Sequence, residues 1–561
     1  MNMIYEAKKQ IKDMVLRTIG ELVAKGNLND EPIPAFNIEI PADSKNGDMS
    51  TNVALVCAKT FKKSPKDIAL MIAQNLYIGS GYFERCETAG PGFLNFFFSP
   101  LWFSNVIEDI ISSKEHYGDT ETGKGKKVLV EFVSANPTGP MHIGNARGGA
   151  IGDCLASVMQ KAGYDVKREF YVNDAGNQIE KFKTSLEVRY LQIYKSGIQM
   201  PEDAYQGEDI VEHAKAFSKE YGDKYVDCDA EERRQALCDF ALPKNIKGLE
   251  TDLLKYRITY DRWFKESELH KSGAVDKIIE MLKESGYTYE LDGALWFKSS
   301  DFGDEKDRVL VRDNGVPTYF VPDIAYHYNK LVTRGFDKAI DILGADHHGY
   351  IPRMKAAMSA LGVDANRLDM VIMQMVNLVK DGERYKLSKR SGKAITLSTL
   401  LDEIPIDAAR FFFNLREPNS HFDFDLDLAV SETSQNPVYY VQYAHARICS
   451  IIKNLKDENL IFSEFDSDSS KLLSEPEEKE LIKFLATFPD CIDESAKNYD
   501  PAAVTRYAVE AATLYHKFYS ACRVKCDDAR LMQARISLCL AVKQVIKNIL
   551  DMLKITCPEH M

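Results

Sequence analysis

The sequence predicts an α/β protein with a parallel central sheet, and the first observation behind this is a strand–helix–strand pattern at 127–172. The Val-rich run at 127–133 is apolar apart from one charged interruption, which is typical of a buried parallel strand. Small and apolar residues then recur at helical spacing over 144–162, and Gly163 ends the helix. A second strand follows at 165–172. Two strands joined by a helix form a βαβ unit, which belongs to a parallel sheet.

A second pattern of the same kind lies further along the chain. It has a strand at 339–343, a helix at 351–361 and a long apolar strand at 369–378. From about residue 431 to the end, the pattern is almost wholly helical. This order predicts an α/β part followed by an all-α part.

The first candidate site is the glycine-rich segment PMHIGNARGGAIGD at 140–153, where the first predicted helix begins. His142, Gly144 and Asn145 lie in its first turn, where free backbone N–H groups and the helix dipole favour a phosphate group. The glycines let a nucleotide approach the backbone closely. The alternative is a tight glycine turn whose histidine only caps the helix.

The second candidate site is the segment KLSKRSG at 386–392, which follows the long apolar strand. The loop at 380–393 holds six basic and two acidic residues, so its net charge is +4 in a chain whose net charge is −13. Lys386, Ser388 and Lys389 in this loop suit a polyanion whose charge grows at a reacting phosphorus. The alternative is a solvated basic loop, which is the usual outcome for a run of charge.

Together the two segments resemble the HIGH and KMSKS motifs of class I aminoacyl-tRNA synthetases. Further stretches resemble the arginyl-tRNA synthetase family: GDMSTNVA at 47–54, AGPGFLNFFFS at 89–99, EFVSANPTGPMH at 131–142, GVPTYFVPDIAYH at 315–327, ILGADHHGY at 342–350, NPVYYVQYAHARI at 436–448 and PEHM at 558–561. The resemblance covers essentially the whole chain. It implies a Rossmann-type class I catalytic domain, an α+β N-terminal domain and an all-α C-terminal bundle that binds the anticodon.

The activity that the resemblance implies is that of an arginine–tRNA ligase. The carboxylate of L-arginine would attack the α-phosphorus of ATP, giving arginyl-adenylate and pyrophosphate, and the terminal ribose of tRNA(Arg) would then take the arginyl group. This chemistry needs no side-chain nucleophile, so positioning and charge stabilisation should carry the rate. The family also implies that Mg²⁺ accompanies ATP and that tRNA is needed for the activation step.

The resemblance implies that arginine contacts Glu131, Asn136, Tyr319, Asp323 and Asp346. This set is chemically reasonable, because a planar, always charged guanidinium needs carboxylates and carbonyl-type acceptors placed for paired hydrogen bonds. Lysine, with a point charge, should fit such a fork poorly. Two alternatives stay open, since Asp323 could be a helix N-cap and Tyr319 a core aromatic.

The sequence departs from the family pattern in both motifs. Asn145 stands where the family usually has a second histidine, and it can donate a hydrogen bond to a phosphate oxygen but cannot carry a proton charge. Leu387 stands where Met is common, and Arg390 takes the last place of the second motif. These two changes are conservative for a loop in which the lysines matter most.

We expect three domains: an N-terminal domain at 1–118, a catalytic domain at 119–430 with a helical insertion at about 179–300, and a helical domain at 431–561. The family implies that the first domain recognises the tRNA elbow, with Asn95 and Phe98 in the matching stretch, and that Gln442 and Arg447 of the last domain contact tRNA. An aromatic side chain there would stack on an unpaired base. The alternatives are a core strand for FLNFFF at 93–98 and ordinary helix packing for the aromatic residues of the bundle.

Composition bounds the remaining possibilities. No run of about 18 uncharged apolar residues occurs, so we expect no membrane span. The 11 cysteines include no C-x-x-C pair, which favours reduced thiols in a cytoplasm and argues against a structural zinc. We expect no metal at the adjacent His347 and His348, because neighbouring residues of a strand-end loop seldom share one. We also expect a monomer.

Two other functions are compatible with single motifs of the sequence. Other nucleotidyltransferases with an HxGH motif are usually much shorter and lack a helical C-terminal bundle. A non-catalytic tRNA-binding paralogue would be expected to lose His142, Lys386 or Lys389, and all three are present.

Overall fold

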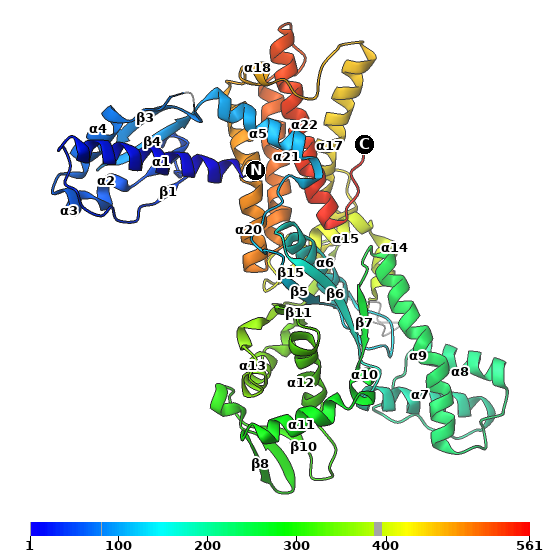
Figure 1. Ribbon diagram of the computed structural model, residues 1–561. Helices are drawn as coiled ribbons and strands as arrows, with labels where there is room; N and C mark the ends of the chain where they lie inside the picture. The colour runs from blue at the N-terminus through cyan, green and yellow to red at the C-terminus, as the bar shows by residue number, and fades with distance from the viewer. Residues whose placement is uncertain (1, 80, 386–394) are drawn as a thin grey trace.

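The computed structural model describes residues 2–79, 81–385 and 395–561. Figure 1 shows an elongated molecule: the N-terminal domain projects from one side of a helical bundle, the central sheet lies below the bundle, and two smaller subdomains extend beyond the sheet. One continuous apolar core runs from α1 (Met3–Ala24) past the central sheet into the bundle. The region of the central sheet is therefore packed directly against the C-terminal helices.

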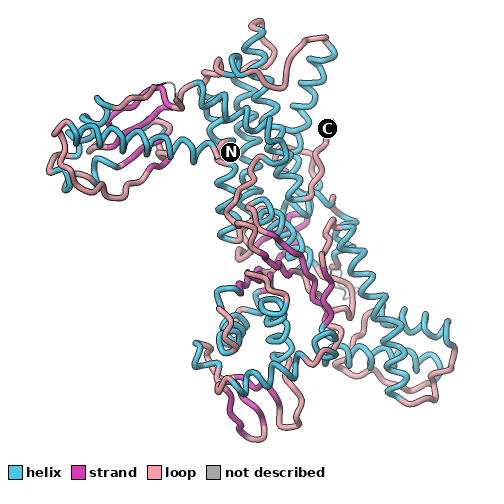
Figure 2. Tube along the Cα trace, viewed as in Figure 1, coloured by secondary structure: helices cyan, strands magenta, loops and turns pink. Residues whose placement is uncertain are grey.

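The N-terminal domain is a four-stranded antiparallel sheet covered by helices (Figure 2). Its strands follow the order β1-β2-β4-β3. Its elements after α1 are β1 (Ile38–Glu39), β2 (Met49–Thr51), α2 (Val53–Val56), α3 (Ala58–Phe61), α4 (Pro65–Asn75), β3 (Phe83–Ala89), β4 (Phe93–Phe98) and α5 (Pro100–Ser113). Helix α5 already packs on the C-terminal bundle, against α22 and α18.

The central sheet is five-stranded and parallel throughout, as the two βαβ patterns predict. Its order is β12-β11-β5-β6-β7, with β12 (Leu368–Met373), β11 (Lys338–Gly344), β5 (Lys127–Glu131), β6 (Asp165–Val172) and β7 (Arg262–Lys265). The chain moves from β5 towards β7 on one side and later adds β11 and β12 on the other. Strands β5 and β11 therefore form the switch point, where ligands of such sheets bind at the carboxyl ends of the strands.

Helix α6 (Ile143–Lys161) crosses from β5 to β6 and shows why the first motif is rich in glycine. A Cβ atom at Gly152 would lie 2.2 Å from the Phe132 ring, and one at Gly149 would lie 2.8 Å from Ile258. At both positions the glycine allows close packing, and at Gly152 a side chain would press on the Phe132 ring next to β5 and push α6 away from the sheet.

The predicted insertion at about 179–300 needs a correction, because it contains a strand of the central sheet. Three helices come first and have a small core of their own: α7 (Gly176–Tyr194), α8 (Glu208–Tyr221) and α9 (Ala230–Lys255). The chain then returns to the sheet as β7. A second subdomain follows, with α10 (Glu266–Lys271), α11 (Ala274–Glu284) and the antiparallel strands β8 (Thr288–Leu291), β9 (Ala294–Phe297) and β10 (Arg308–Val311).

Two helices stand before and after β11 in the chain. The first is α12 (Phe320–Tyr328), which continues into a π-helical turn η4 (Asn329–Thr333), and the second is α13 (Tyr350–Ala360). They share an apolar core with α11 and with residues of β6 and β7.

The single strand predicted at 369–378 is wrong. The chain forms β12 and then leaves the central sheet, and β13 (Val376–Lys380) pairs instead with β14 (Glu383–Arg384) and β15 (Phe422–Asp425). The backbone between them is held elsewhere: the N–H of Gln374 donates to Pro418 O at 2.9 Å, and Arg147 donates to Gln374 O at 2.7 Å. These tertiary hydrogen bonds divide an apolar run that looks continuous in the sequence.

The remaining elements are helical. Three connect the catalytic region to the bundle: α14 (Leu397–Glu403), α15 (Ile406–Phe413) and α16 (Leu426–Val430). The bundle consists of α17 (Pro437–Asp457), α18 (Ser467–Ser470), α19 (Pro476–Leu485), α20 (Phe488–Asn498), α21 (Ala502–Ala521) and α22 (Ala529–Leu553). Across the described ranges, no helix combines the length and apolarity that crossing a membrane requires.

Candidate active site

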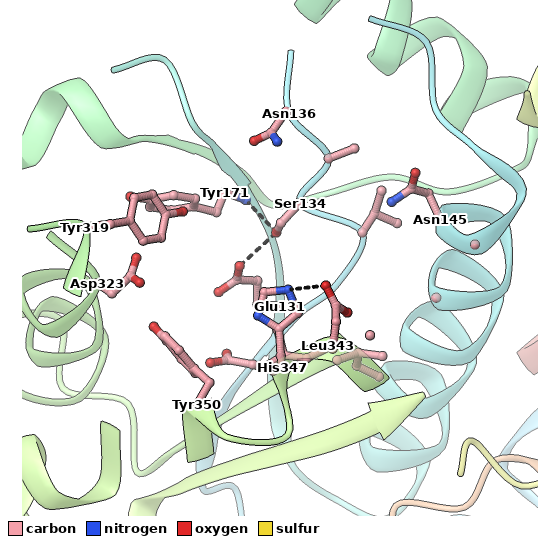
Figure 3. A pocket seen from close by; sticks show the side chains of 18 of the residues that line it. Glu131, Ser134, Asn136, Asn145, Tyr171, Tyr319, Asp323, Leu343, His347 and Tyr350 are labelled. Carbon is pink, nitrogen blue, oxygen red and sulfur yellow. Dashed lines mark hydrogen bonds and ion pairs between the residues drawn. The ribbon is translucent and has the colours of Figure 1, made fainter. Parts of the chain in front are cut away.

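A cavity of about 1120 Å³ opens at the carboxyl ends of β5 and β11. Figure 3 shows Tyr319, Asp323 and Tyr350 gathered on one side of it and Asn145 on the opposite side, with Glu131 and Ser134 between them. Of the residues predicted from the sequence, the cavity is lined by Glu131, Asn136, His142, Gly144, Asn145, Tyr319, Asp323 and Asp346. The fold thus brings together segments that lie far apart in the chain.

Asp323 is the buried carboxylate of this cavity. It is 7% exposed, Tyr350 is its hydrogen-bond partner, and the described cations form no ion pair with it. Burial raises the pKa of Asp323 well above its usual range, and the charges of Glu266 and Glu131 add to that rise. The N-cap interpretation is wrong, since the N-cap of α12 is Tyr319. A buried carboxylate without a cationic partner is suited to a cationic ligand.

The other predicted arginine ligands differ in exposure. Glu131 is the last residue of β5 and is buried, whereas Asn136 is exposed at the cavity wall. Tyr319 is 58% exposed, so it is not a core aromatic. The side chain of Asp346 is 84% exposed, and its carboxylate lies 3.6 Å from His347 Nε2. Asp346 therefore lies at the mouth of the cavity, while Asp323 lies at its inner wall.

The backbone that follows β5 has an unusual conformation. Val133 and Ser134 both have positive φ, of 71° and 39°, a region that β-branched residues such as valine rarely adopt. The turn is held by Ser134 Oγ, which donates to Glu131 Oε1 at 2.8 Å and accepts from the N–H of Tyr171 at 3.1 Å. Ser134 was missed by the sequence reasoning, because backbone strain leaves no mark in the residue pattern.

At the opposite side of the cavity lies the N-terminus of α6. His142 is its exposed N-cap residue, and the backbone N–H of His142 donates to Asn145 Oδ1 at 3.0 Å. Asn145 therefore caps the first turn through its side-chain oxygen and keeps its amide N–H groups for other partners. The residue that departs from the family pattern has a structural reason to be asparagine.

The described segment that follows the second motif in the sequence lies beside the first motif. Ile143 N donates to Ile395 O at 3.1 Å, Leu397 N donates to Met141 O at 2.9 Å, and His142 pairs with Thr396 as an isolated bridge. The segment that follows the basic loop is thus fixed at the start of α6. The predicted residues Lys386, Ser388 and Lys389 lie outside the described residues.

The residues predicted to contact tRNA are mostly buried. Asn95 accepts a hydrogen bond from Ser50 Oγ at 2.8 Å, and the Phe98 ring stacks on Trp102 with centroids 3.6 Å apart. Both are at most 4% exposed, which favours the core-strand interpretation of FLNFFF.

In the bundle, Gln442 is 9% exposed and donates to Asp407 Oδ2 and to Thr556 O, both at 2.9 Å, so its amide holds the C-terminal tail. Arg447 is only partly buried and lies over the Tyr519 ring, with its guanidinium carbon 4.2 Å from the ring centroid. Of these four predicted residues, Arg447 is the one with a surface available to RNA.

Among residues 2–79, 81–385 and 395–561, no cluster of three or more His, Cys, Asp and Glu side chains could hold a metal ion.

Three family models match the chain in order. They are the arginyl tRNA synthetase N terminal domain at residues 7–98, the catalytic domain of class I (R) tRNA synthetases at 106–454, and the DALR anticodon binding domain at 441–561. The catalytic model alone spans more than half of the chain. The chain belongs to the arginyl-tRNA synthetase family.

The chain is also similar over its full length to individual arginyl-tRNA synthetases. The arginine–tRNA ligases of Caldanaerobacter subterraneus subsp. tengcongensis and Acetivibrio thermocellus are 53% and 50% identical to it, and each alignment covers 100% of both chains. A solved structure from Campylobacter jejuni, described as an arginyl-tRNA synthetase, is 34% identical, covers 83% of this chain and 100% of its own, and has a TM-score of 0.74. The Thermus thermophilus arginyl-tRNA synthetase, at 20% identity, covers 99% and 100% with a TM-score of 0.73 and supports the same fold.

Proposed function

We propose that the cavity binds L-arginine with its guanidinium at Asp323 and Tyr350 and its α-ammonium near Glu131. As a member of its family the chain is an arginine–tRNA ligase, which activates arginine with ATP and transfers it to tRNA(Arg). The observation that supports this orientation is Asp323, a buried carboxylate without a cationic partner among the described residues. A guanidinium would supply the missing positive charge and two parallel donors.

The remaining predicted ligands fit the same orientation. The phenol of Tyr319 lies on the same side of the cavity as Asp323, and Asn136 lies on the loop that leaves β5 (Figure 3). Asp346 is too exposed to discriminate strongly between cations, because solvent screens its charge. We assign it to the entrance of the site, where it would attract the positively charged substrate.

The opposite side of the cavity is proposed to hold ATP. The positive end of the α6 dipole and the side chains of His142 and Asn145 would face the phosphates, and the glycine at position 144 leaves the approach open. Lys386, Ser388 and Lys389 would act with them on the charge that develops at the α-phosphorus. Mg²⁺ would enter with the nucleotide, bound mainly by its phosphate oxygens.

We also propose that arginine activation depends on tRNA. The buried carboxylate of Asp153 in the middle of α6 accepts hydrogen bonds from Arg410 at 2.6 Å, from Arg168 at 2.9 Å and from Lys554 at 2.9 Å. Lys554 is the C-cap residue of α22, the last helix of the bundle. Through these ion pairs, a tRNA held by the bundle would influence α6, the helix whose N-cap residue is His142.

The wider expectations concern tRNA, assembly and location. Arg447 with the Tyr443 and Tyr519 rings beside it is the proposed anticodon contact, since an arginine over aromatic rings offers both charge and a stacking surface. We expect a monomer that acts in the cytoplasm.

The decisive experiment is ATP–pyrophosphate exchange with each of the twenty amino acids, with and without tRNA(Arg). Arginine should be the one amino acid that supports exchange, and lysine should not. Exchange with a different amino acid, or with none under any condition, would overturn the assignment.

A further inference from the structure

Three carboxylates lie in a row across the central sheet, beneath the arginine side of the cavity. Glu131 on β5 is the register partner of Asp341 on β11 and of Glu169 on β6. Register partners on neighbouring parallel strands project from the same face of the sheet, so these three acids are direct neighbours. All three are buried, with relative exposures of 9%, 2% and 1% for Glu131, Asp341 and Glu169. Such a row of like charges is unstable unless cations are placed against it.

One segment supplies the partners of all three acids. Helix α12 and the π-helical turn η4 lay Tyr326, His327, Lys330 and Arg334 along the row. Arg334 contacts both oxygens of Glu169, and the hydroxyl of Tyr326 donates to Glu169 Oε1 at 2.7 Å. A π-helical turn shifts the register of a helix, and such turns occur frequently at functional sites.

Lys330 is the bridge in the middle of this arrangement. It is completely buried, its Nζ donates to Glu131 Oε2 and, at 2.7 Å, to Asp341 Oδ1, and it lies over the Tyr326 ring. The second oxygen of Asp341 is paired with His327 Nε2 at 2.7 Å. Burial by itself lowers the pKa of the Lys330 ammonium, but Asp341 and Glu131 outweigh that effect and raise it above its usual value.

The three acids differ in how many of their carboxylate oxygens are paired with a nitrogen of this segment. Both oxygens of Asp341 and both oxygens of Glu169 have nitrogen partners from this segment. Glu131 has such a partner only at Oε2, because its Oε1 accepts from the neutral hydroxyl of Ser134. Glu131 is also the acid of the row that stands beside the Ser134 turn at the centre of the cavity (Figure 3). Its carboxylate still has lone pairs for a further donor.

We infer that Lys330 is a positioning residue: by fixing Glu131 Oε2 against Asp341, it presents the other oxygen of Glu131 to the α-ammonium group of the amino-acid substrate. This inference rests on the proposed orientation of arginine in the cavity. Lys330 contacts no substrate itself. Through Glu131 it selects for an α-amino group at the centre of the cavity.

The test compares arginine with 5-guanidinopentanoic acid, which keeps the guanidinium and the carboxylate but lacks the α-amino group. The variant is Lys330→Met. The matched control is Lys338→Met, which removes a lysine at the first residue of β11 that pairs with Asp369 of β12. We measure the KM of arginine in aminoacylation and the inhibition constant of the analogue. Lys330→Met should raise the arginine KM about tenfold or more, as expected for loss of a charge-assisted contact, and should leave the analogue within about twofold. Lys338→Met should change neither.

A pH profile separates positioning from general damage. The charged or titratable groups that face Lys330 are Glu131 from β5, Asp341 from β11, and Asp323, Tyr326 and His327 from α12, with Glu169 from β6 behind them. Without Lys330, two buried carboxylates would face each other with no cation between them, and close like charges favour uptake of a proton. A carboxyl group that has taken up a proton would not hold an ammonium group. In Lys330→Met, kcat/KM for arginine should therefore fall as the pH is lowered from 8 to 6, with a steeper fall than in the parent enzyme.

Two further variants keep the inference falsifiable if Lys330→Met folds poorly. Lys330→Arg retains the cation and should keep most of the preference for arginine over the analogue, whereas Glu131→Gln should lose that preference. If Glu131→Gln leaves the preference intact, the proposed orientation of arginine is wrong. If Glu131→Gln loses it but Lys330→Met weakens arginine and the analogue equally, the orientation stands and the role of Lys330 is refuted.

Discussion

Replacing Asp323 with asparagine is the most direct perturbation of the arginine site. The substitution keeps the size of the side chain and removes its charge, at a position that is 7% exposed and hydrogen-bonded to Tyr350. Loss of one partner of a desolvated charged pair costs about 2–5 kcal/mol, which corresponds to a rise in arginine KM of roughly 30-fold to several thousand-fold. The KM of ATP should stay within about twofold, because the proposed nucleotide side lies across the cavity.

The assay is aminoacylation of tRNA(Arg) with arginine and ATP varied separately. The matched control is Asp346→Asn, the same chemical change at an exposed carboxylate, which should cost less than about 1 kcal/mol because solvent screens it. An unchanged arginine KM in Asp323→Asn, or an equal loss for arginine and ATP, would refute the assignment of Asp323 to the guanidinium.

The pH dependence gives a second check on the same residue. Burial raises the pKa of Asp323 in the free protein, whereas a bound guanidinium stabilises the ionised form. Arginine binding should therefore release a proton at pH values below the raised pKa, and arginine affinity should increase as the pH rises through it. Calorimetry in buffers of different ionisation enthalpy measures this release, which Asp323→Asn should abolish.

Three other predictions concern the helix α6 and the tRNA. Asp153→Asn should lower the free energy of unfolding by about 3–5 kcal/mol in urea titration, because it leaves buried cations without their carboxylate. Arg410, Lys554 and Arg168 together hold the pKa of Asp153 below its usual range despite burial. The stability that Asp153 contributes should therefore be present above a pH of about 4 and be lost as the pH falls below that value. His142→Ala should slow adenylate formation by roughly two to three orders of magnitude with little change in arginine affinity, and equal losses in both would indicate a structural role. Pyrophosphate exchange should be weak without tRNA(Arg) and rise strongly when tRNA(Arg) is added, and deletion of the chain after residue 431 should remove this stimulation. The binding of tRNA should weaken steeply with salt. Robust exchange without tRNA would contradict the coupling through the bundle.

The sequence by itself was sufficient for the fold class and the family. The βαβ pattern at 127–172 and the first part of the pattern at 339–378 correspond to parallel strands of the central sheet, because buried strands and their crossover helices have a local apolar periodicity. The helix predicted at 144–162 corresponds to α6, because small and apolar residues at helical spacing and a glycine stop are local signals. The strand at 369–378 failed because its division depends on hydrogen bonds from Arg147 and to Pro418, which are distant in sequence.

The site was determined only in part by the sequence. Residue type and resemblance singled out Asp323 and Glu131, but chemistry alone does not say which carboxylate is already paired. The tertiary structure decides that, because it pairs Glu131 and Asp341 with Lys330, whereas Asp323 forms no ion pair with a described residue. The register of three parallel strands and a π-helical turn create this difference, and neither has a local signal in the sequence. For the same reason Gln442, predicted as a tRNA contact, holds the C-terminal tail: burial depends on which helices meet, and that is a property of the whole fold.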